Sequence, residues 1–197
     1  MTPNQLISVA VLAVLVFWAV GAYNRLVRLK NIIADAFGQI DVQLKRRYDL
    51  IPNLVEAAKK YLSHERETLD AVISARNLAK SASDSVRRCP ANAAAVTTLA
   101  VAEQALSSSL GQLFALNEAY PELKADQTIR ELSEELTSTE NKVSFARQAF
   151  NDAVLNYNNA QGQFPALLIA RLFSFAPAAM LQATETEQER KAVGISM

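Results

Sequence analysis

The chain has 197 residues, half of them apolar, and contains few glycines, prolines and aromatic side chains. This composition favours helices, because sheets draw on β-branched and aromatic residues. Basic and acidic residues balance at 20 each, so no global field attracts nucleic acid, and a single cysteine, Cys89, excludes an internal disulfide framework.

An uncharged apolar segment runs from Leu6 to Tyr23. As a helix it would measure about 27 Å, close to the thickness of a bilayer's hydrocarbon core. Trp18 and Tyr23 lie toward its far end, where aromatic residues are typical of a membrane–water interface. A cleaved signal peptide is the alternative, because residues 20–22 resemble a cleavage site, but no lysine or arginine precedes the apolar run. We therefore predict a transmembrane helix at residues 6–23, preceded by a short non-cytoplasmic N-terminus at residues 1–5.

Basic residues directly after this segment predict its orientation. Arg25, Arg28 and Lys30 follow the apolar run. Lysine and arginine collect on the cytoplasmic side of membrane proteins. We expect the rest of the chain to lie in the cytoplasm, attached through a single span.

Residues 24–181 show apolar side chains at helical spacing in four stretches. Three breaks separate them. Pro52 predicts the first break, because proline disfavours helix at the residue before it. Ser81–Asn92, which contains Pro90, predicts a loop, and Tyr120-Pro121 predicts the last break. The four stripes cover residues 26–44, 54–76, 96–113 and 129–157.

The fourth stripe alternates steps of three and four residues, as in the seam of a coiled coil. Short connections place successive helices antiparallel. The fold class we predict is therefore all-α, a transmembrane helix followed by an antiparallel bundle of long helices. The end of the bundle far from the membrane would hold Lys45–Asp49 beside Asn117–Leu123. The near end would hold Ser81–Cys89 beside the residues after Tyr157.

Phe164–Leu181 is an apolar segment interrupted by one arginine and one serine, and its two prolines argue against a second span. It is either a short helix that closes the core or an amphipathic segment in the bilayer interface, with nearby arginines on anionic lipids. The candidate lipid contacts are Arg87, Arg88, Phe164, Leu168, Arg171, Phe173 and Phe175. Residues 182–197 are predicted to form a polar, frayed tail.

Motifs for catalysis or metal binding are absent or incomplete in the sequence. It has no glycine-rich phosphate loop and no pair of cysteines, and His64-Glu65 begins a zinc-binding motif whose second histidine is replaced by Thr68. Adjacent arginines could activate Cys89, but a structural role is favoured. We predict no catalytic residue, no cofactor and no metal. An enzyme that uses Asp41, Asp49, His64 or Glu65 is a less favoured hypothesis.

Charge is distributed unevenly along the chain. Arg25–Lys60 carries eight basic and four acidic residues, whereas Glu118–Glu140 carries seven acidic and two basic residues. Attraction between the first and fourth helices is the simpler explanation, with each exposed pair worth about 0–1 kcal/mol. A docking face for another protein is the alternative. The candidate partner surface consists of Lys45, Arg46, Arg47, Asp49, Asn53, Glu118, Tyr120 and Glu122.

Two runs in the sequence carry a family resemblance. The first reads IDVQLKRRYDLIPNLV at residues 40–55, and the second reads AYPELKA at residues 119–125. Together with Ala146-Arg147, they closely resemble the LemA family over about Tyr23 to Phe175. Phe37 stands where that family is expected to have a tryptophan. The resemblance implies a bacterial membrane-anchored helical bundle, and it supplies no catalytic residues.

These observations lead to one functional hypothesis and one alternative. We expect a non-enzymatic scaffold or adaptor in the bacterial inner membrane, which binds the lipid bilayer and either a protein partner or a second copy of itself, but no nucleic acid. The alternative is a membrane-shaping protein that attaches through both its anchor and residues 164–181.

Overall fold

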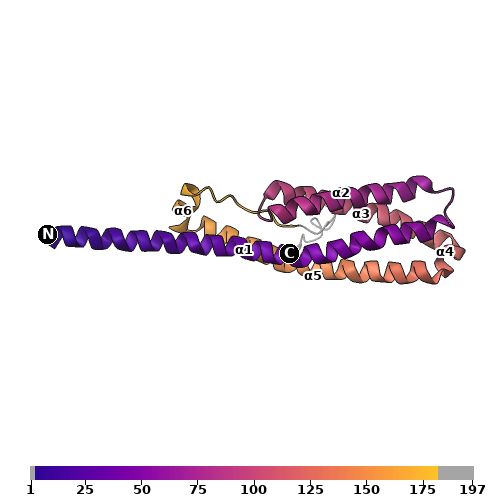
Figure 1. The fold of residues 1–197 in the computed structure, drawn as a ribbon, viewed down its shortest axis with the longest axis horizontal. Helices are drawn as coiled ribbons and strands as arrows, with labels where there is room; N and C mark the ends of the chain where they lie inside the picture. Colours follow the sequence, from indigo (N-terminus) through magenta and orange to yellow (C-terminus); the bar gives the residue numbers. More distant parts are fainter. Residues whose placement is uncertain (1–2, 182–197) are drawn as a thin grey trace, which may run out of the picture.

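The computed structural model describes residues 3–181, which form an elongated molecule without strands (Figure 1). The predicted all-α class and the antiparallel bundle are confirmed. The predicted polar tail, residues 182–197, lies outside the described residues. The helices are α1 (Pro3–Lys59), α2 (Arg66–Arg88), α3 (Ala93–Ala119), α4 (Pro121–Ala125), α5 (Gln127–Gly162) and α6 (Ala166–Leu172).

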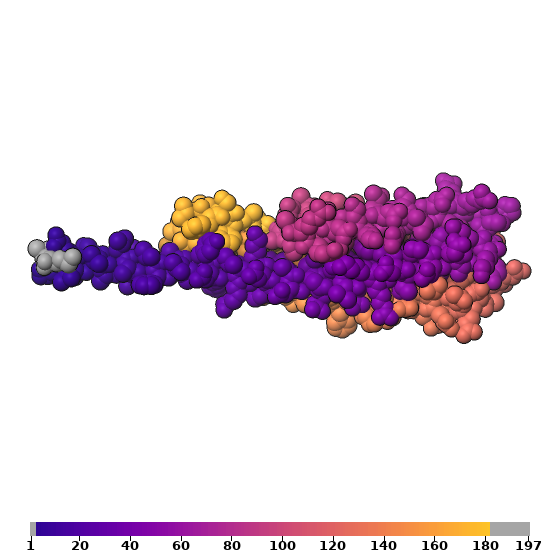
Figure 2. Space-filling view, in the orientation of Figure 1, coloured from indigo at the N-terminus to yellow at the C-terminus, as the bar shows by residue number. Residues whose placement is uncertain are grey.

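Helix α1 is continuous over 57 residues and about 85 Å. Its N-terminal part projects beyond the other helices as a bare rod (Figures 1 and 2). Within the described residues it is the one helix long and apolar enough to cross a membrane, and its most apolar stretch buries nothing against the protein. From Leu26 onward one face of the same helix is buried, so a single element passes from a bare apolar rod into the core of the bundle.

The break predicted at Pro52 was wrong, because α1 continues through this residue to Lys59. Proline has no N–H, so Pro52 cannot donate to the carbonyl of Tyr48 one turn earlier. Arg76 of α2 replaces that donor: its Nε lies 2.9 Å from the Tyr48 carbonyl oxygen. The helix therefore survives its proline because a neighbouring helix supplies the missing hydrogen bond.

The loop predicted at Ser81–Asn92 was also too long. Helix α2 extends to Arg88 and buries Ala82, Ser83 and Val86, so burial outweighs the turn-forming composition of this stretch. The chain reverses within residues 89–92. The side chain of Asn92 then caps α3 by accepting a hydrogen bond of 3.1 Å from the backbone N–H of Ala95.

Helix α1 is the centre of the packing, since it lies against α5, α2 and α6, while α3 packs on α2. The main core is built from the predicted apolar stripes, with Phe37 of α1 in edge-to-face contact with Phe150 of α5. A second, smaller core joins Leu26, Ala160 and Ala170 where α6 folds back on α1 and α5. These helix–helix contacts form because successive long helices run antiparallel, as the short connections predicted.

Both ends of the bundle differ from the prediction. Since α1 runs past Pro52, the end far from the apolar rod consists of residues 60–65 and 120–126, where the Tyr61 hydroxyl donates to Asp126 at 2.9 Å. Asp126 also caps α5 by accepting from the N–H of Ile129. Lys45–Asp49 lie further back, beside α3 and the middle of α5. At the other end, α5 and α6 continue along α1 well beyond α2 and α3 (Figure 1).

The bridge across Pro52 generates a prediction about stability. Arg76→Met leaves the Tyr48 carbonyl without a partner, and we expect the free energy of unfolding to fall by about 1–3 kcal/mol. Pro52→Ala restores a backbone donor, so the same Arg76→Met change made in that variant should have a smaller effect. Thermal unfolding of the four proteins, followed by circular dichroism, measures this coupling.

Asp49→Asn serves as the control, because it removes the long 3.9 Å ion pair of Arg76 but keeps the carbonyl contact. Equal losses from Arg76→Met in both backgrounds would show that Arg76 does not act by replacing the donor.

Candidate functional site

A buried ionic cluster connects the C-terminal third of α1 to α3. Arg47 is 4% exposed, and its Nη1 lies 2.7 Å from Oε2 of Glu103. Its Nη2 contacts the hydroxyl of Ser107 at 3.1 Å. The other oxygen of Glu103 accepts a hydrogen bond from the Tyr48 hydroxyl at 2.5 Å. The carboxylate of Glu103 is thus shared between a cation and a phenol, and each is held by α1.

Helical spacing explains why these polar groups are buried. Glu103 falls between Leu99 and Leu106 at the spacing of the apolar stripe of α3, so its side chain points into the seam rather than toward water. Arg47 occupies the equivalent position between Leu44 and Ile51 on α1. Sequence reasoning missed Glu103, and the signal that could have found it is this charged residue in an apolar stripe.

Burial sets the electrostatics of the cluster. It raises the pKa of the Tyr48 phenol well above its ordinary value, and the nearby Glu103 carboxylate raises it further. The phenol is therefore neutral at physiological pH and remains a donor to Glu103. A charge removed from water requires such partners, because an unpaired buried ion is strongly unfavourable.

A cavity of about 130 Å³ adjoins the cluster between α1, α3 and α5. Glu140 and Arg147 of α5 contribute charged side chains to it, and Leu181 from the C-terminal segment lies at its wall. The Nε atom of Arg147 is buried and has no hydrogen-bond partner among the described residues. Burial lowers the pKa of the Arg147 guanidinium from its ordinary value, and the carboxylates of Glu103 and Glu140 partly oppose this shift.

A second buried carboxylate, Asp41, ties α1 to α2. It pairs with Lys45 at 2.7 Å and with Arg87 at 3.1 Å, and it accepts a hydrogen bond from Ser83 at 3.3 Å. Arg87 also pairs with Asp84 on its own helix. These contacts fix the end of α2 about 27 Å further along α1 than Tyr23.

The structure does not bring the predicted partner residues into one surface. Arg46 pairs with Glu135 of α5, at 2.9 Å from its Nε, so the predicted attraction between the charge blocks is present here. Arg47 is buried and cannot be part of an exposed face, which corrects its assignment. Lys45, Asp49 and Asn53 are exposed along the C-terminal third of α1, whereas Glu118, Tyr120 and Glu122 are exposed at the far end.

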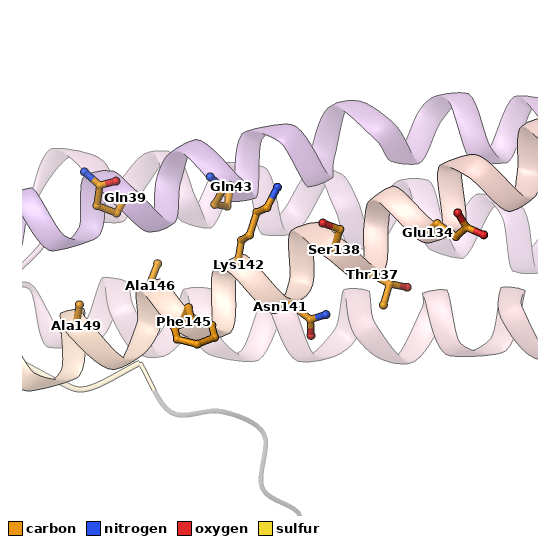
Figure 3. A pocket seen from close by; sticks show the side chains of 10 residues that line it. All are labelled: Gln39, Gln43, Glu134, Thr137, Ser138, Asn141, Lys142, Phe145, Ala146 and Ala149. Carbon is orange, nitrogen blue, oxygen red and sulfur yellow. The ribbon is translucent and has the colours of Figure 1, made fainter.

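An open groove of about 810 Å³ runs between α1 and α5 (Figure 3). Gln39 and Gln43 line it from α1, and the Oε1 atom of Gln43 is buried without a hydrogen-bond partner in the described part of the chain. Lys142 extends from α5 toward α1 (Figure 3). Phe145 lines the same groove although it is 79% exposed. The groove thus combines an exposed aromatic ring with amides and charges.

The predicted lipid contacts divide into two groups. Arg87 pairs with Asp41, so Arg87 and Arg88 lie away from α6. This corrects the prediction that they lie near residues 164–181. The other residues surround α6, where the ring of Tyr23 contacts Phe173 and Phe175 at centroid distances of 4.9 and 5.6 Å. One face of α6 buries Ile169 and Ala170. The exposed remainder includes Phe164, Leu168, Arg171 and Phe173, and Phe175 is half-buried.

The residues considered for an enzyme are not gathered. Asp41 is buried against α2, Asp49 is exposed on α1, and His64 lies in the turn after α1. Glu65, next to His64, lies near the hydroxyl of Tyr120 at 3.5 Å. Over residues 3–181 there is no group of three or more histidine, cysteine, aspartate or glutamate side chains that could hold a metal ion.

The buried pair and the exposed pair give contrasting predictions. Glu103→Gln leaves Arg47 buried with only the exposed carboxylate of Glu140, 4.0 Å away, as a counter-ion, and we expect a loss of about 3–5 kcal/mol in the free energy of unfolding. Glu135→Gln breaks the exposed pair with Arg46 and should cost about 0–1 kcal/mol. Adding Arg47→Met to Glu103→Gln should recover part of the loss, because no buried charge is then left unpaired. Thermal unfolding of these variants measures the losses. Similar small losses for Glu103→Gln and Glu135→Gln would contradict the view that the Arg47–Glu103 pair is withdrawn from water.

Comparison with known proteins relates this architecture to one family. Residues 36–196 match the model of the LemA family. A protein named Protein LemA, from Metamycoplasma hominis, is 24% identical over 183 residues, which cover 93% of this chain and 79% of that protein. The resemblance of the residue 40–55 and 119–125 runs is thereby confirmed. Since the family model covers well over half of the chain, this protein belongs to the LemA family.

Proposed function

We propose that this protein is a non-enzymatic scaffold, anchored in the bacterial inner membrane, that presents its bundle to a protein partner or to a second copy of itself. The observation that carries the proposal is the continuity of α1. One helix contains both the bare apolar stretch and the central core face of the bundle. An anchor that is joined to its domain without a hinge suits a protein that holds a binding surface at a fixed distance from the bilayer.

The proposed orientation rests on charge. Arg25, Arg28 and Lys30 follow the apolar stretch, and such residues favour the cytoplasmic side. With the bundle in the cytoplasm, the turn at residues 60–65 is the part farthest from the bilayer. It lies about 55 Å beyond Tyr23 along α1.

Two exposed regions support partner binding. The first is the α1/α5 groove, where Phe145 exposes an apolar ring beside the amides of Gln39 and Gln43. Aromatic residues are enriched where proteins bind one another, and Phe145 is such a residue. The second is the far end, with exposed Glu118, Tyr120 and Glu122.

In-cell photocrosslinking tests the scaffold proposal. A photoreactive residue at Phe145 or at Glu122 should yield protein adducts, because these positions lie on the proposed surfaces. Lys80 on the exposed side of α2 is the matched control and should yield few. Two differently tagged copies of the chain, expressed together, distinguish self-association from another partner. Adducts that are no more frequent at Phe145 and Glu122 than at Lys80 would contradict the proposal.

A second candidate role, contact of α6 with the bilayer, is favoured by one specific observation. Phe164, which lies beside Trp18 of the apolar rod, is 81% exposed, and Leu172, the last residue of α6, is 74% exposed. Phe173 lines an apolar hollow with Val16 and Val20 of that rod. If the rod spans lipid, the exposed apolar face of α6 would lie in the headgroup region, as in an interfacial amphipathic helix.

Depth measurements test this second role. In full-length protein with Cys89→Ser, an environment-sensitive fluorophore on Leu172→Cys should show blue-shifted emission and quenching by spin-labelled lipid. The same fluorophore on Arg88→Cys should remain in water, because the adjacent Arg87 pairs with Asp41, about 27 Å beyond Tyr23 along α1. Equal, water-like emission from both positions would leave α6 with a packing role only.

A further inference from the structure

The end of the bundle next to the apolar rod carries basic side chains without acidic ones. Leu26 packs with Ala160 and Ala170, so residues 3–34 and 153–181 meet here, while α2 and α3 end before this level (Figure 1). The two segments contain no aspartate or glutamate and four basic residues, Arg25, Arg28, Lys30 and Arg171. Within residues 3–181, no carboxylate lies within 4.0 Å of the side-chain nitrogens of these four. The described protein therefore leaves their charge without a counter-ion.

One of these side chains, Arg25, lines a cleft of about 300 Å³ between α1 and the segment that leads into α6. Trp18 and Ala22 line the cleft from α1, and Gln163 and Phe164 line it from the other side. Trp18 lies seven residues before Arg25, which places it about 10 Å nearer the N-terminal end of the rod. The ring of Phe164 keeps most of its surface uncovered. The cleft thus has a cationic end and an apolar end.

We propose that this cleft binds a phospholipid, whose phosphate pairs with the guanidinium of Arg25 and whose upper acyl chains contact Trp18, Ala22 and Phe164. The site depends on the proposed function of the rod as a membrane anchor. Arginine presents N–H donors in a planar fork that matches phosphate oxygens. Tryptophan is enriched at the membrane–water interface, where the head groups lie.

The order of polar and apolar groups in the cleft agrees with the direction of a lipid in a bilayer. With the apolar stretch before Trp18 in the hydrocarbon core, Arg25 lies about 10 Å closer to water than Trp18 does. A phospholipid likewise has its phosphate on the water side of its acyl chains. Inorganic phosphate would occupy only the end of the cleft at Arg25 and would leave Trp18 and Phe164 uncovered.

The charge around the cleft selects among head groups. A zwitterionic head group carries a cation beyond its phosphate, and no acidic residue of the two segments can receive that cation. Arg28 and Lys30, which follow Arg25 on the same helix, would repel it. Phosphatidylglycerol has no such cation, so we expect it to bind more tightly than phosphatidylcholine.

The fluorescence of Trp18 tests the site, because this residue is the only tryptophan in the chain. Full-length protein is reconstituted in two series of vesicles in which the ratio of phosphatidylglycerol to phosphatidylcholine is varied. Bromine atoms, which quench tryptophan, are carried by the acyl chains of phosphatidylglycerol in one series and of phosphatidylcholine in the other. Comparison of the two series gives the relative affinity of the cleft for the two lipids.

Three variants test whether a preference belongs to the cleft. Arg25→Gln removes the phosphate contact. Phe164→Ala removes an apolar wall but keeps every charge, and it should fold normally because the ring is exposed. Arg28→Gln is the matched control, since it removes the same charge three residues away but does not line the cleft.

The wild type and Arg28→Gln should prefer phosphatidylglycerol by about fivefold, the factor expected for one basic residue beside anionic lipid. The preference should be lost in Arg25→Gln and reduced in Phe164→Ala. No preference in the wild type, an unchanged preference in Arg25→Gln or Phe164→Ala, or an equal loss in Arg28→Gln would overturn the lipid site and leave the anchor in place. Absence of quenching by either lipid would instead show that the rod does not enter the bilayer, which would overturn the anchor and the site together.

Discussion

The continuity of α1 through Pro52 is the constraint on which the rest of the structure depends. Helix α1 contacts α5, α2 and α6, α3 is held through α2, and the course of α1 past Pro52 decides where the bundle ends. The contact from Arg76 to the Tyr48 carbonyl keeps the two halves collinear. A kink there would turn the last two turns of α1 away from α2 and expose Leu54 and Ala58, which are buried in the main core.

Buried charge gives the packing its register. Apolar seams built from leucine and valine tolerate a slip of one helical turn, because similar side chains replace one another. A slip of α3 along the bundle would separate Glu103 from both Arg47 and Tyr48, leaving a carboxylate and a guanidinium unpaired in the core. Asp41 adds the same restriction for α2 through Arg87 and Ser83. The ionic contacts therefore add little net stability relative to an apolar core, but they oppose the alternative alignments strongly.

The apolar pattern within each segment predicted the helices. Where the helices end relative to one another along the bundle depended on contacts between residues far apart in the sequence. Apolar residues at helical spacing sufficed for the stripes of α1, α3 and α5, since each stripe is a local property of its own segment. Pro52 could not be interpreted in this way, because the donor that compensates it is Arg76, on another helix. Because α1 and α2 are longer than predicted, Arg87 lies further from the apolar rod than the sequence led us to expect. Arg47 was predicted to lie on an exposed surface for the same reason. Its buried partner, Glu103, lies on another helix, and its place in the apolar stripe of α3 was not recognised.

The two functional proposals make opposite demands on the exposed apolar surface. A partner that fills the α1/α5 groove must cover Phe145, which faces water halfway along the bundle, whereas lipid can cover only the apolar groups near Tyr23. Phe164, Leu172 and Phe173 meet that condition because α6 folds back beside the rod. Phe145 does not, since it lies on α5 at the level of Gln39 and Gln43, roughly 25–30 Å from Tyr23 along α1. Bilayer contact can therefore explain the exposed apolar side chains of α6 but not those of the groove. The groove is the surface for which we propose a protein partner.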